Sequence, residues 1–473
     1  MEHVTITPRD PFRFASVIGE ERTELLAVDA ATEAFERLHG RSVINISSTA
    51  AGGGVAEMLH VLLGLIRGVD VDARWFVIDG SPAFFEITKR LHNHLYGAVG
   101  DGGELGEAEH EIYEDTLQAE RDALAAHARE GDVVVLHDPQ VAGLAECAQR
   151  LGCKVVWRCH VGIDRPNECS RIGWDFLRRY LEPFVDHFVF TDRRFAPDWV
   201  GADRLSVIWP SIDPFAPKNQ HLDDAKVEAI LTHVGLIDGT PGDTEFERTD
   251  GSPGRVELMC DVVRTGPSPG PDVPLVVQVS RWDSIKDMGG VMQAFADHVD
   301  SGRTAQLVLA GPSVSAVADD PEGAEVLRDC FDQWRQLPHA VRARVQLVCL
   351  PMHDLDENAV IVNALQRHAH VVVQKSLAEG FGLTAAEAML KGTPVVASAV
   401  GGLVDQVIDG QSGLLVQDPT DLEEFGTAVC RLLDEDDLRQ RLGEAARARA
   451  IETHLGDTHL RRWLDVVRRL DLD

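Results

Sequence analysis

The sequence predicts an α/β fold made of two doubly wound parallel-sheet domains with helices on both faces of each sheet. Short β-branched runs such as His370 to Gln374 recur along the chain and are typical of strands that are buried on both faces. Glycine-rich turns follow several of these runs, and helical patterns follow the turns. Because this arrangement occurs in both halves of the chain, we expect two domains that face a cleft.

Composition is ordinary for a globular enzyme. The 473 residues are 44% hydrophobic and 26% charged, which allows two or three domains with full cores. No apolar run approaches the roughly 18 residues of a membrane helix, and the chain does not start with a basic segment followed by an apolar one. We therefore expect a cytoplasmic protein with no membrane partner. The eight cysteines include no Cys-x-x-Cys pair, so buried thiols are expected in place of a zinc site or disulfides.

Net charge limits the classes of partner. A formal charge of −32 argues against nucleic acid and anionic membranes, because both bind basic surfaces. An anionic substrate would need local cations, and the chain has only seven lysines. Lys286 therefore stands out as a candidate anion-binding residue.

The first half of the chain contains a glycine loop between a strand and a helix. A helix is expected over 23–38 and a strand over 43–47. The loop containing Gly53 and Gly54 then leads into an amphipathic helix that ends near Arg67. A nicotinamide-type dinucleotide fold is disfavoured, because Glu57 interrupts the G-x-G-x-x-G spacing.

Polar side chains end the next two predicted strands of this half. His137 and Asp138 end a strand that begins at Asp132, and Arg158 and His160 end the strand that begins at 154. Polar residues at the carboxyl ends of strands suit a ligand cleft, although a lone histidine is more often a satisfied core residue. Further strands are expected over 187–191 and 205–209.

Linker signals divide the chain. The proline-rich segment 210–219 marks the exit from the first domain, and we expect domains over 1–225 and 226–450. Residues 238–274 are rich in Gly, Pro, Asp and Thr and predict a loop insertion, with order only at 256–263. Residues 421–473 have a continuous helical pattern, of which 451–473 would form a C-terminal helix.

The second half begins with a strand over 275–280 that leads into a loop with two cations. Arg281 and Lys286 lie five residues apart, before a helix over 291–299. An arginine fork and a lysine point charge suit a diphosphate, because both offset charge on a departing phosphate. Strands over 306–312 and 345–350, with helices over 324–337 and 357–368, continue the αβ pattern.

The segment 374–398 predicts a strand end, a glycine turn, a helix and a strand. Gly380 and Gly382 break the strand, and the helix starts near Leu383. The helix N-terminus can hold an anion, and the carboxylates of Glu379 and Glu387 can accept hydrogen bonds from sugar hydroxyls. By contrast, the D-x-D at 70–72 precedes a strand and predicts a surface turn, so no metal site is expected.

The segment around Glu379 and Glu387 resembles the Glu-x7-Glu motif of retaining glycosyltransferases of GT-B type, family 4 among them, in which two Rossmann-like domains face a cleft. The resemblance implies that Glu379 meets hydroxyls of the donor sugar and that Glu387 binds the nucleotide ribose. It also assigns Arg281 and Lys286 to the phosphates. The backbone amides that would reach the sugar and diphosphate are those of Gly380, Phe381, Gly382, Leu383 and Thr384.

Residues 45–60 and 154–167 are similar, more narrowly, to the trehalose-forming glycosyltransferring synthases of this family. This resemblance implies glucose transfer, with retention, from ADP-, UDP- or GDP-glucose to free glucose, giving trehalose with no added cofactor. His160 would join Arg281, Lys286 and Glu379 as a catalytic residue, and the last helix would cross back to the first domain. The implied acceptor-binding residues are Gly53, Gly54, Asp138 and Arg158.

Other functions remain open from the sequence. A trehalose phosphorylase shares these motifs and would transfer glucose to inorganic phosphate. Another family 4 glycosyltransferase, a nucleotide-sugar epimerase and a non-enzymatic sugar-nucleotide sensor are further alternatives. The nucleotide base and the physiological direction are undetermined, and a homodimer is expected only because large enzymes of this type are often dimers.

Overall fold

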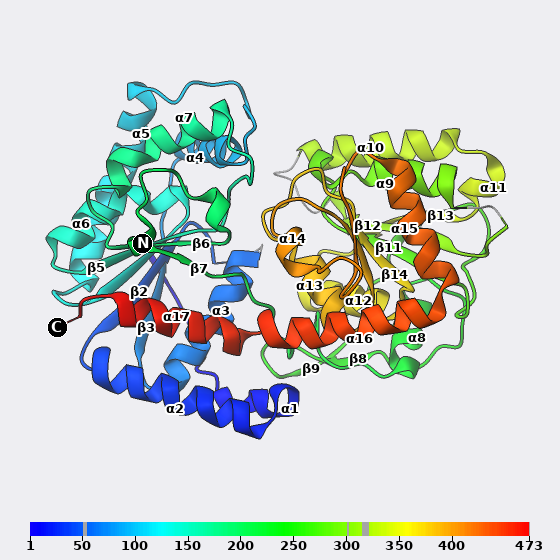
Figure 1. The fold of residues 1–473 in the computed structure, drawn as a ribbon, viewed down its shortest axis with the longest axis horizontal. Helices are drawn as coiled ribbons and strands as arrows, with labels where there is room; N and C mark the ends of the chain where they lie inside the picture. Colours follow the sequence, from blue (N-terminus) through cyan, green and yellow to red (C-terminus); the bar gives the residue numbers. More distant parts are fainter. Residues whose placement is uncertain (51–53, 300–301, 315–320, 473) are drawn as a thin grey trace. The chain divides into compact units, whose positions relative to one another are not determined.

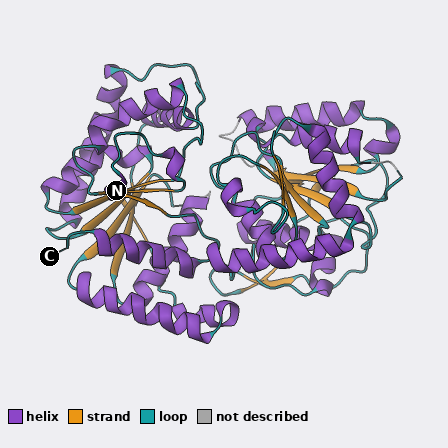
Figure 2. Cartoon of the chain, viewed as in Figure 1, coloured by secondary structure: helices purple, strands orange, loops and turns teal. Residues whose placement is uncertain are grey.

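The computed structural model describes residues 1–50, 54–299, 302–314 and 321–472. Its contacts divide the chain into two compact units, one of Met1–Ser211 with His454–Asp473 and the other of Ile212–Thr453. Each unit contains a mostly parallel sheet with helices on both faces (Figure 2), which confirms the predicted α/β fold. None of the helices in the described part of the chain is both long and apolar enough to cross a membrane.

The first unit is built on a seven-stranded sheet in the order β1-β3-β2-β4-β5-β6-β7. β1 runs antiparallel to β3, and the other pairs are parallel. The predicted strands all form, whereas β1 was not expected from the sequence. The strands are β1 (Glu2–Val4), β2 (Ser42–Ser47), β3 (Asp72–Val77), β4 (Val133–His137), β5 (Lys154–Cys159), β6 (His187–Phe190) and β7 (Leu205–Val207).

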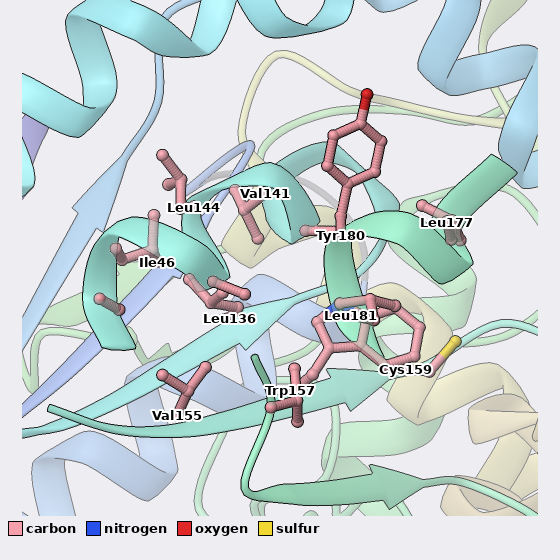
Figure 3. Packing of buried hydrophobic residues seen from close by; sticks show 14 of the residues in the cluster. Ile46, Leu136, Val141, Leu144, Val155, Trp157, Cys159, Leu177, Tyr180 and Leu181 are labelled. Atoms are coloured by element: carbon pink, nitrogen blue, oxygen red, sulfur yellow. The ribbon is translucent and has the colours of Figure 1, made fainter. Parts of the chain in front are cut away.

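Two groups of helices cover this sheet (Figure 1). On one face, apolar side chains of the strands and helices form a buried core, in which Leu136 and Trp157 lie together with Leu177 and Leu181 (Figure 3). The helices of this face are α4 (Pro82–Leu95), α5 (Glu107–His127), α6 (Ala145–Arg150) and α7 (Glu168–Leu181). Those of the other face are α2 (Glu20–Arg37), α3 (Gly54–Gly68) and α17 (Gly456–Arg469).

The C-terminal helix belongs to the first unit. The helical pattern over 421–473 forms three helices, α15 (Leu422–Asp434), α16 (Asp436–Thr453) and α17, of which α17 lies within the C-terminal helix expected over 451–473. The breaks fall at Glu435 and at His454 and Leu455. α17 then packs on α2 and α3, where Arg22 Nε donates to Asp457 Oδ2 at 2.8 Å.

The second unit has a seven-stranded sheet in the order β10-β13-β12-β11-β14-β15-β16, in which β10 alone is antiparallel to its neighbour. Most of these strands consist largely of Val and Leu, because helices cover both faces of the sheet and residues that point to either face are therefore buried. They are β10 (Asp261–Val263), β11 (Leu275–Val279), β12 (Gln306–Pro312), β13 (Val345–Leu350), β14 (Val371–Gln374), β15 (Val395–Ser398) and β16 (Leu414–Val416).

Helices again pack on this sheet from two sides (Figure 1). The helices α9 (Met288–His298), α10 (Pro321–Gln336) and α15 contribute apolar side chains to one core, whereas α12 (Leu355–His368) packs between β11 and α8 (Asp224–His233). The helix that carries the predicted donor motif, α13 (Leu383–Leu390), packs against β14, β15 and α16.

Two segments differ from the sequence-based description. The loop expected over 238–274 contains a ribbon of β8 (Glu245–Glu247) and β9 (Pro253–Arg255), and β10 joins the main sheet. Contacts place residues 212–225 in the second unit, where we had placed the boundary at 225. The reason is local: Asn363 Nδ2 of α12 donates to the carbonyls of Pro217 and Gln220, both at 2.9 Å.

Candidate active site

The parallel pairing of β11 with β14 in the second unit brings two predicted residues together. Chains that leave parallel neighbours at their carboxyl ends emerge at the same edge of the sheet. Lys286 follows β11 and Glu379 follows β14, and Lys286 Nζ lies 2.6 Å from Glu379 Oε2. Ser376 Oγ at 3.1 Å and Gln374 Nε2 at 3.3 Å donate to the same oxygen. Three donors therefore hold the Glu379 carboxylate in one position.

A second glycine turn supports the turn that follows β14. Gly382 has a φ of 89° and begins α13, as the sequence predicts. Gly401, with a φ of 49°, lies so close that an added Cβ would be 1.6 Å from the Glu379 carbonyl oxygen, and a Cβ at Gly402 would be 2.8 Å from Phe381 Cα. Sequence analysis did not assign the 401–402 pair to the site. Its signal was the Gly-Gly dipeptide shortly after β15.

The N-terminus of α13 remains available to an anion. The N-cap residue Gly382 has no side chain with which to cap the helix, and the first N–H groups of a helix have no acceptor within it. These groups carry a partial positive charge, which is the basis of phosphate binding at helix N-termini. The amides concerned are those of Leu383 and Thr384, which by the family resemblance would reach the sugar and diphosphate. Phe381 is buried, and its carbonyl accepts a hydrogen bond from Gln406 Nε2.

Glu387 is a buried carboxylate among cations. Its side chain lies one turn into α13, and its Oε1 is 3.7 Å from Lys218 Nζ. Lys391 Nζ donates to the backbone carbonyl of Glu387 at 3.1 Å and to Asn219 Oδ1 at 3.0 Å. Burial lowers the pKa of Lys391 to about 7, although the Glu387 carboxylate acts in the opposite direction.

The two predicted phosphate-binding cations have different surroundings. Lys286 is largely buried, whereas the Arg281 side chain is 65% exposed and donates to Asp283 Oδ2, a carboxylate of its own loop, at 2.7 Å. Sequence analysis missed a third cation, Lys375, which is buried directly after β14 and contacts the Asp287 carboxylate. The sequence contained a clue to this lysine, because Lys375 directly follows a predicted buried strand and the chain has only seven lysines.

In the first unit, the structure gathers the predicted acceptor-side residues at the ends of β4 and β5. These strands are parallel neighbours, and His137 pairs with Arg158 in their register. The backbone N–H of His160 donates to Asp138 Oδ1 at 2.7 Å, and His137 Nδ1 lies 3.2 Å from His160 Nε2. Asp138 has a φ of 66°, a conformation that few non-glycine residues adopt.

The hydrogen bonds set the protons of the two imidazoles. His137 Nε2 lies 3.0 Å from Asn45 Oδ1, so in this orientation of the Asn45 amide the nitrogen carries a proton, and Asn45 Nδ2 has no hydrogen-bond partner among the described residues. His137 Nδ1 then accepts from His160 Nε2, which leaves His160 Nδ1 without a proton. His160 can therefore accept a hydrogen bond from a hydroxyl group at Nδ1.

Arg158 is fully buried within this cluster. Its Nη2 donates to the Ile208 carbonyl at 2.7 Å and to Thr191 Oγ1 at 3.2 Å, while Nε and Nη1 have no hydrogen-bond partner among the described residues. Burial lowers the pKa of Arg158 to about 10 and raises that of Asp138 to about 7, and each charge opposes the shift of the other. The two groups thus partly compensate one another in a low-dielectric interior.

α17 adds a histidine to this cluster that sequence analysis missed. His459 Nδ1 donates to the Trp209 carbonyl at 2.9 Å, and His459 Nε2 accepts from Trp463 Nε1 at 3.0 Å. Burial, followed by the charge of Arg158, lowers the pKa of His459 to about 3. No local sequence signal could have placed it there, since it lies about 300 residues from His160.

Two remaining predictions concern glycines and metals. Gly53 lies outside the described residues, and Gly54 begins α3. Among the described residues, no three His, Cys, Asp or Glu side chains are grouped as metal ligands. Asp70 of the D-x-D lies in the turn before β3, with a φ of 62°.

Comparisons with known proteins agree with both units. Residues 45–197 match the trehalose synthase N-terminal domain, and residues 267–449 match the glycosyl transferases group 1 family. The chain is 32% identical to the trehalose synthase of Pyrococcus horikoshii over 97% of this chain and 95% of that protein. It is 26% identical to the trehalose phosphorylase of Grifola frondosa, over 87% of this chain and 54% of that protein.

The fold also matches a solved structure. The α,α-trehalose-phosphate synthase (UDP-forming) of Burkholderia xenovorans, in complex with glucose-6-phosphate, has a TM-score of 0.65 at 16% identity, covering 91% of this chain and all of that one. The protein is therefore a glycosyltransferase of the GT-B class, as the Glu-x7-Glu motif predicts. Within that class, it belongs to the trehalose synthase family.

The close approach of Gly401 to Glu379 generates a stability prediction. Gly401→Ala should lower the free energy of unfolding by at least about 2 kcal/mol more than Gly410→Ala does, because only Gly401 has a backbone oxygen at 1.6 Å from the new Cβ. Gly410 is a matched control, since its φ of 69° is also positive and nothing lies within 4 Å. Urea unfolding of both variants measures the difference, and equal losses would contradict the packing described.

The buried histidines generate a pH prediction. Burial lowers the pKa of His137 and His459 to about 3 and lowers that of His160 as well. Below about pH 6.5 the unfolded chain binds protons at these sites and the folded chain does not, so stability falls as pH falls. Asp138 acts in the opposite direction, because its pKa of about 7 means that the folded chain binds this proton at a higher pH than the unfolded chain does. This one group offsets the effect of only one of the three histidines. Urea unfolding midpoints should therefore decrease from pH 7 to pH 5.

A variant isolates one of these histidines. His137→Gln keeps a hydrogen-bonding side chain but removes the titration, so the slope of unfolding free energy against pH should decrease by up to about 1.4 kcal/mol per pH unit. His221→Gln, at an exposed position, is measured in parallel as the comparison variant. A wild-type slope in His137→Gln would show that His137 is protonated to the same extent in both states.

Proposed function

We propose that this protein transfers glucose, with retention at the anomeric carbon, from a nucleoside diphosphate glucose to free glucose, forming trehalose. The observation that carries the proposal is the Lys286–Glu379 pair beside the uncapped N-terminus of α13. Its supports are the membership in the trehalose synthase family and the group 1 glycosyltransferase match over residues 267–449.

The donor would use residues of the second unit. A diphosphate requires cations and N–H donors, which Lys286 and the first turn of α13 offer. The Glu379 carboxylate, held by its three donors, can accept hydrogen bonds from sugar hydroxyls. Glu387 would bind the ribose. The exposed side chain of Arg281 would exchange its ion pair with Asp283 for one with a phosphate. These positive groups matter because the chain has a formal net charge of −32, which repels an anionic substrate.

The acceptor glucose would use residues of the first unit. His160 Nδ1, which carries no proton in the arrangement described, would accept a hydrogen bond from a glucose hydroxyl and orient it. Asp138 would hold the His160 backbone, and Arg158 would support Asp138 electrostatically. A neutral His160 is important here, since an imidazolium would donate at both nitrogens.

The proposed step breaks the bond between the anomeric carbon of the donor glucose and the β-phosphate oxygen. A bond forms on the same face between this carbon and the anomeric hydroxyl oxygen of free glucose, and the hydroxyl proton passes to the leaving phosphate. Lys286 and the α13 amides would stabilise the charge that builds on that phosphate. The proposal assigns this charge compensation to the protein's own groups, without an added cofactor.

Product analysis tests the reaction. The purified protein is incubated with glucose and, separately, ADP-, UDP- or GDP-glucose, and carbon NMR is used to detect a symmetrical α,α-linked disaccharide. We expect trehalose with at least one donor. The similarity to a trehalose phosphorylase favours one second candidate, so trehalose is also incubated with inorganic phosphate. Glucose 1-phosphate in that assay, without trehalose from any nucleotide sugar, would replace our proposal with phosphorolysis.

A lysine variant tests the phosphate role. Lys286→Ala should lower kcat by at least about a hundredfold, because it removes a cation that stabilises the leaving group. Lys226→Ala is the control: Lys226 lies on α8 of the same unit, pairs with Asp243 at 3.2 Å and should leave kcat near that of the wild type. Circular dichroism checks that both variants fold. Near-normal turnover of folded Lys286→Ala would remove this lysine from the mechanism.

A further inference from the structure

A cavity of about 210 Å³ lies between the edge strand β7 and the helix α17, within the first unit. Arg193, Arg462 and Arg469 line it, together with Ser206, Ile208 and Asp465. None of the described residues assigned to the sugar donor or acceptor lines it. Three arginines around one cavity are unexpected in a chain with a charge of −32.

The three arginine side chains form no hydrogen bond or ion pair with any other residue that the structure describes. The neighbouring Arg468 shows the contrast, since it pairs with Asp29, Glu33 and Asp465. Among the described residues that line the cavity, Asp465 is the one carboxylate, and Arg468 Nη1 already donates to it at 2.9 Å. The described lining therefore carries three positive charges against one carboxylate, which is itself bound to Arg468.

Arg462 is the most buried of the three. Its guanidinium lies 4.6 Å from the centre of the Trp209 ring, and burial lowers its pKa. Removing a guanidinium from water costs free energy unless a counter-charge or hydrogen bonds offset that cost. The cation–π contact with the aromatic ring offsets only part of the cost. A bound anion would supply the remainder.

The chemistry and size of the cavity identify the class of anion. Guanidinium groups bind phosphate oxygens in bidentate fashion, and a dianion neutralises several arginines better than a carboxylate does. A cavity of about 150 Å³ admits benzene, so this one has room for a phosphate and part of an organic group beside Ile208. We propose that this cavity binds a phosphomonoester, a small molecule that carries a terminal phosphate.

The site is connected to the acceptor-side cluster through β7. Ile208 lines the cavity, and its carbonyl accepts the 2.7 Å hydrogen bond from Arg158. The next residue, Trp209, contacts Arg462 with its ring and His459 with its carbonyl. A phosphomonoester in this cavity thus contacts the segment that holds Arg158 and His459. The site itself does not depend on the function proposed above.

Chemical protection tests the site without a mutation. The protein is treated with phenylglyoxal, which modifies arginine, with and without glycerol 3-phosphate, and modified residues are mapped by peptide mass spectrometry. We expect at least about threefold slower modification of Arg193, Arg462 and Arg469 with the ligand. Arg150, whose side chain is 75% exposed and lies outside the cavity, should react at the same rate in both samples. Equal rates at the three cavity arginines would overturn the proposal.

Calorimetry of variants separates this site from the proposed donor site. Glycerol 3-phosphate and inorganic phosphate are each titrated into wild type, the double variant Arg462→Gln/Arg469→Gln, Lys286→Ala and the control Arg150→Gln. We expect at least about tenfold weaker binding in the double variant alone, with Lys286→Ala retaining the wild-type affinity for glycerol 3-phosphate. Loss of binding in Lys286→Ala with full binding in the double variant would place the phosphate at the donor site and overturn the proposal.

The same titrations compare the two ligands. Tighter binding of glycerol 3-phosphate than of inorganic phosphate would show that the organic group is recognised.

Discussion

The parallel pairing of β11 with β14 is the constraint on which the predicted donor residues depend. Val276 and Val277 face Val371 and Val372 in this register, so the loops after the two strands leave the same edge of the sheet. Lys286, which follows β11, pairs with Glu379, which follows β14. Lys375, which follows β14, pairs with Asp287, which follows β11. Two reciprocal ion pairs thus connect the loops, and a shift in strand register would separate all four side chains.

In the first unit, buried polar groups are organised by hydrogen bonds as well as by charge. The chain from Asn45 through His137 to His160 orients two imidazoles and keeps both neutral, because burial disfavours their protonated forms. Arg158 is the one charge within this group that is always positive, and Asp138 lies near it. The group is not fully satisfied, because Asn45 Nδ2 and two nitrogens of Arg158 have no hydrogen-bond partner among the described residues.

Strand positions could be predicted within a few residues, because buried parallel strands have an unambiguous apolar pattern. β4, β12 and β15 are examples. The segments without such a pattern were missed. β8 and β9 come from residues whose composition indicates a loop, and they pair with each other within that segment, whereas β10 pairs with β13 of the main sheet. The break between α16 and α17 was hidden by a helical pattern that continues through it.

Local pattern and spacing predicted the α/β class and the candidates Lys286 and Glu379, and the resemblance to a known family added the glycosyltransferase motif and the candidates Asp138, Arg158 and His160. These features depend on residue types within short segments, where strand, turn and helix preferences act. The contacts of those residues were decided by tertiary structure alone. His459 joins His160's cluster, Gly401 supports Glu379 and Arg462 meets Arg193 and Arg469 at one cavity because strand order and helix packing bring distant segments together. No short-range preference encodes such long-range contacts.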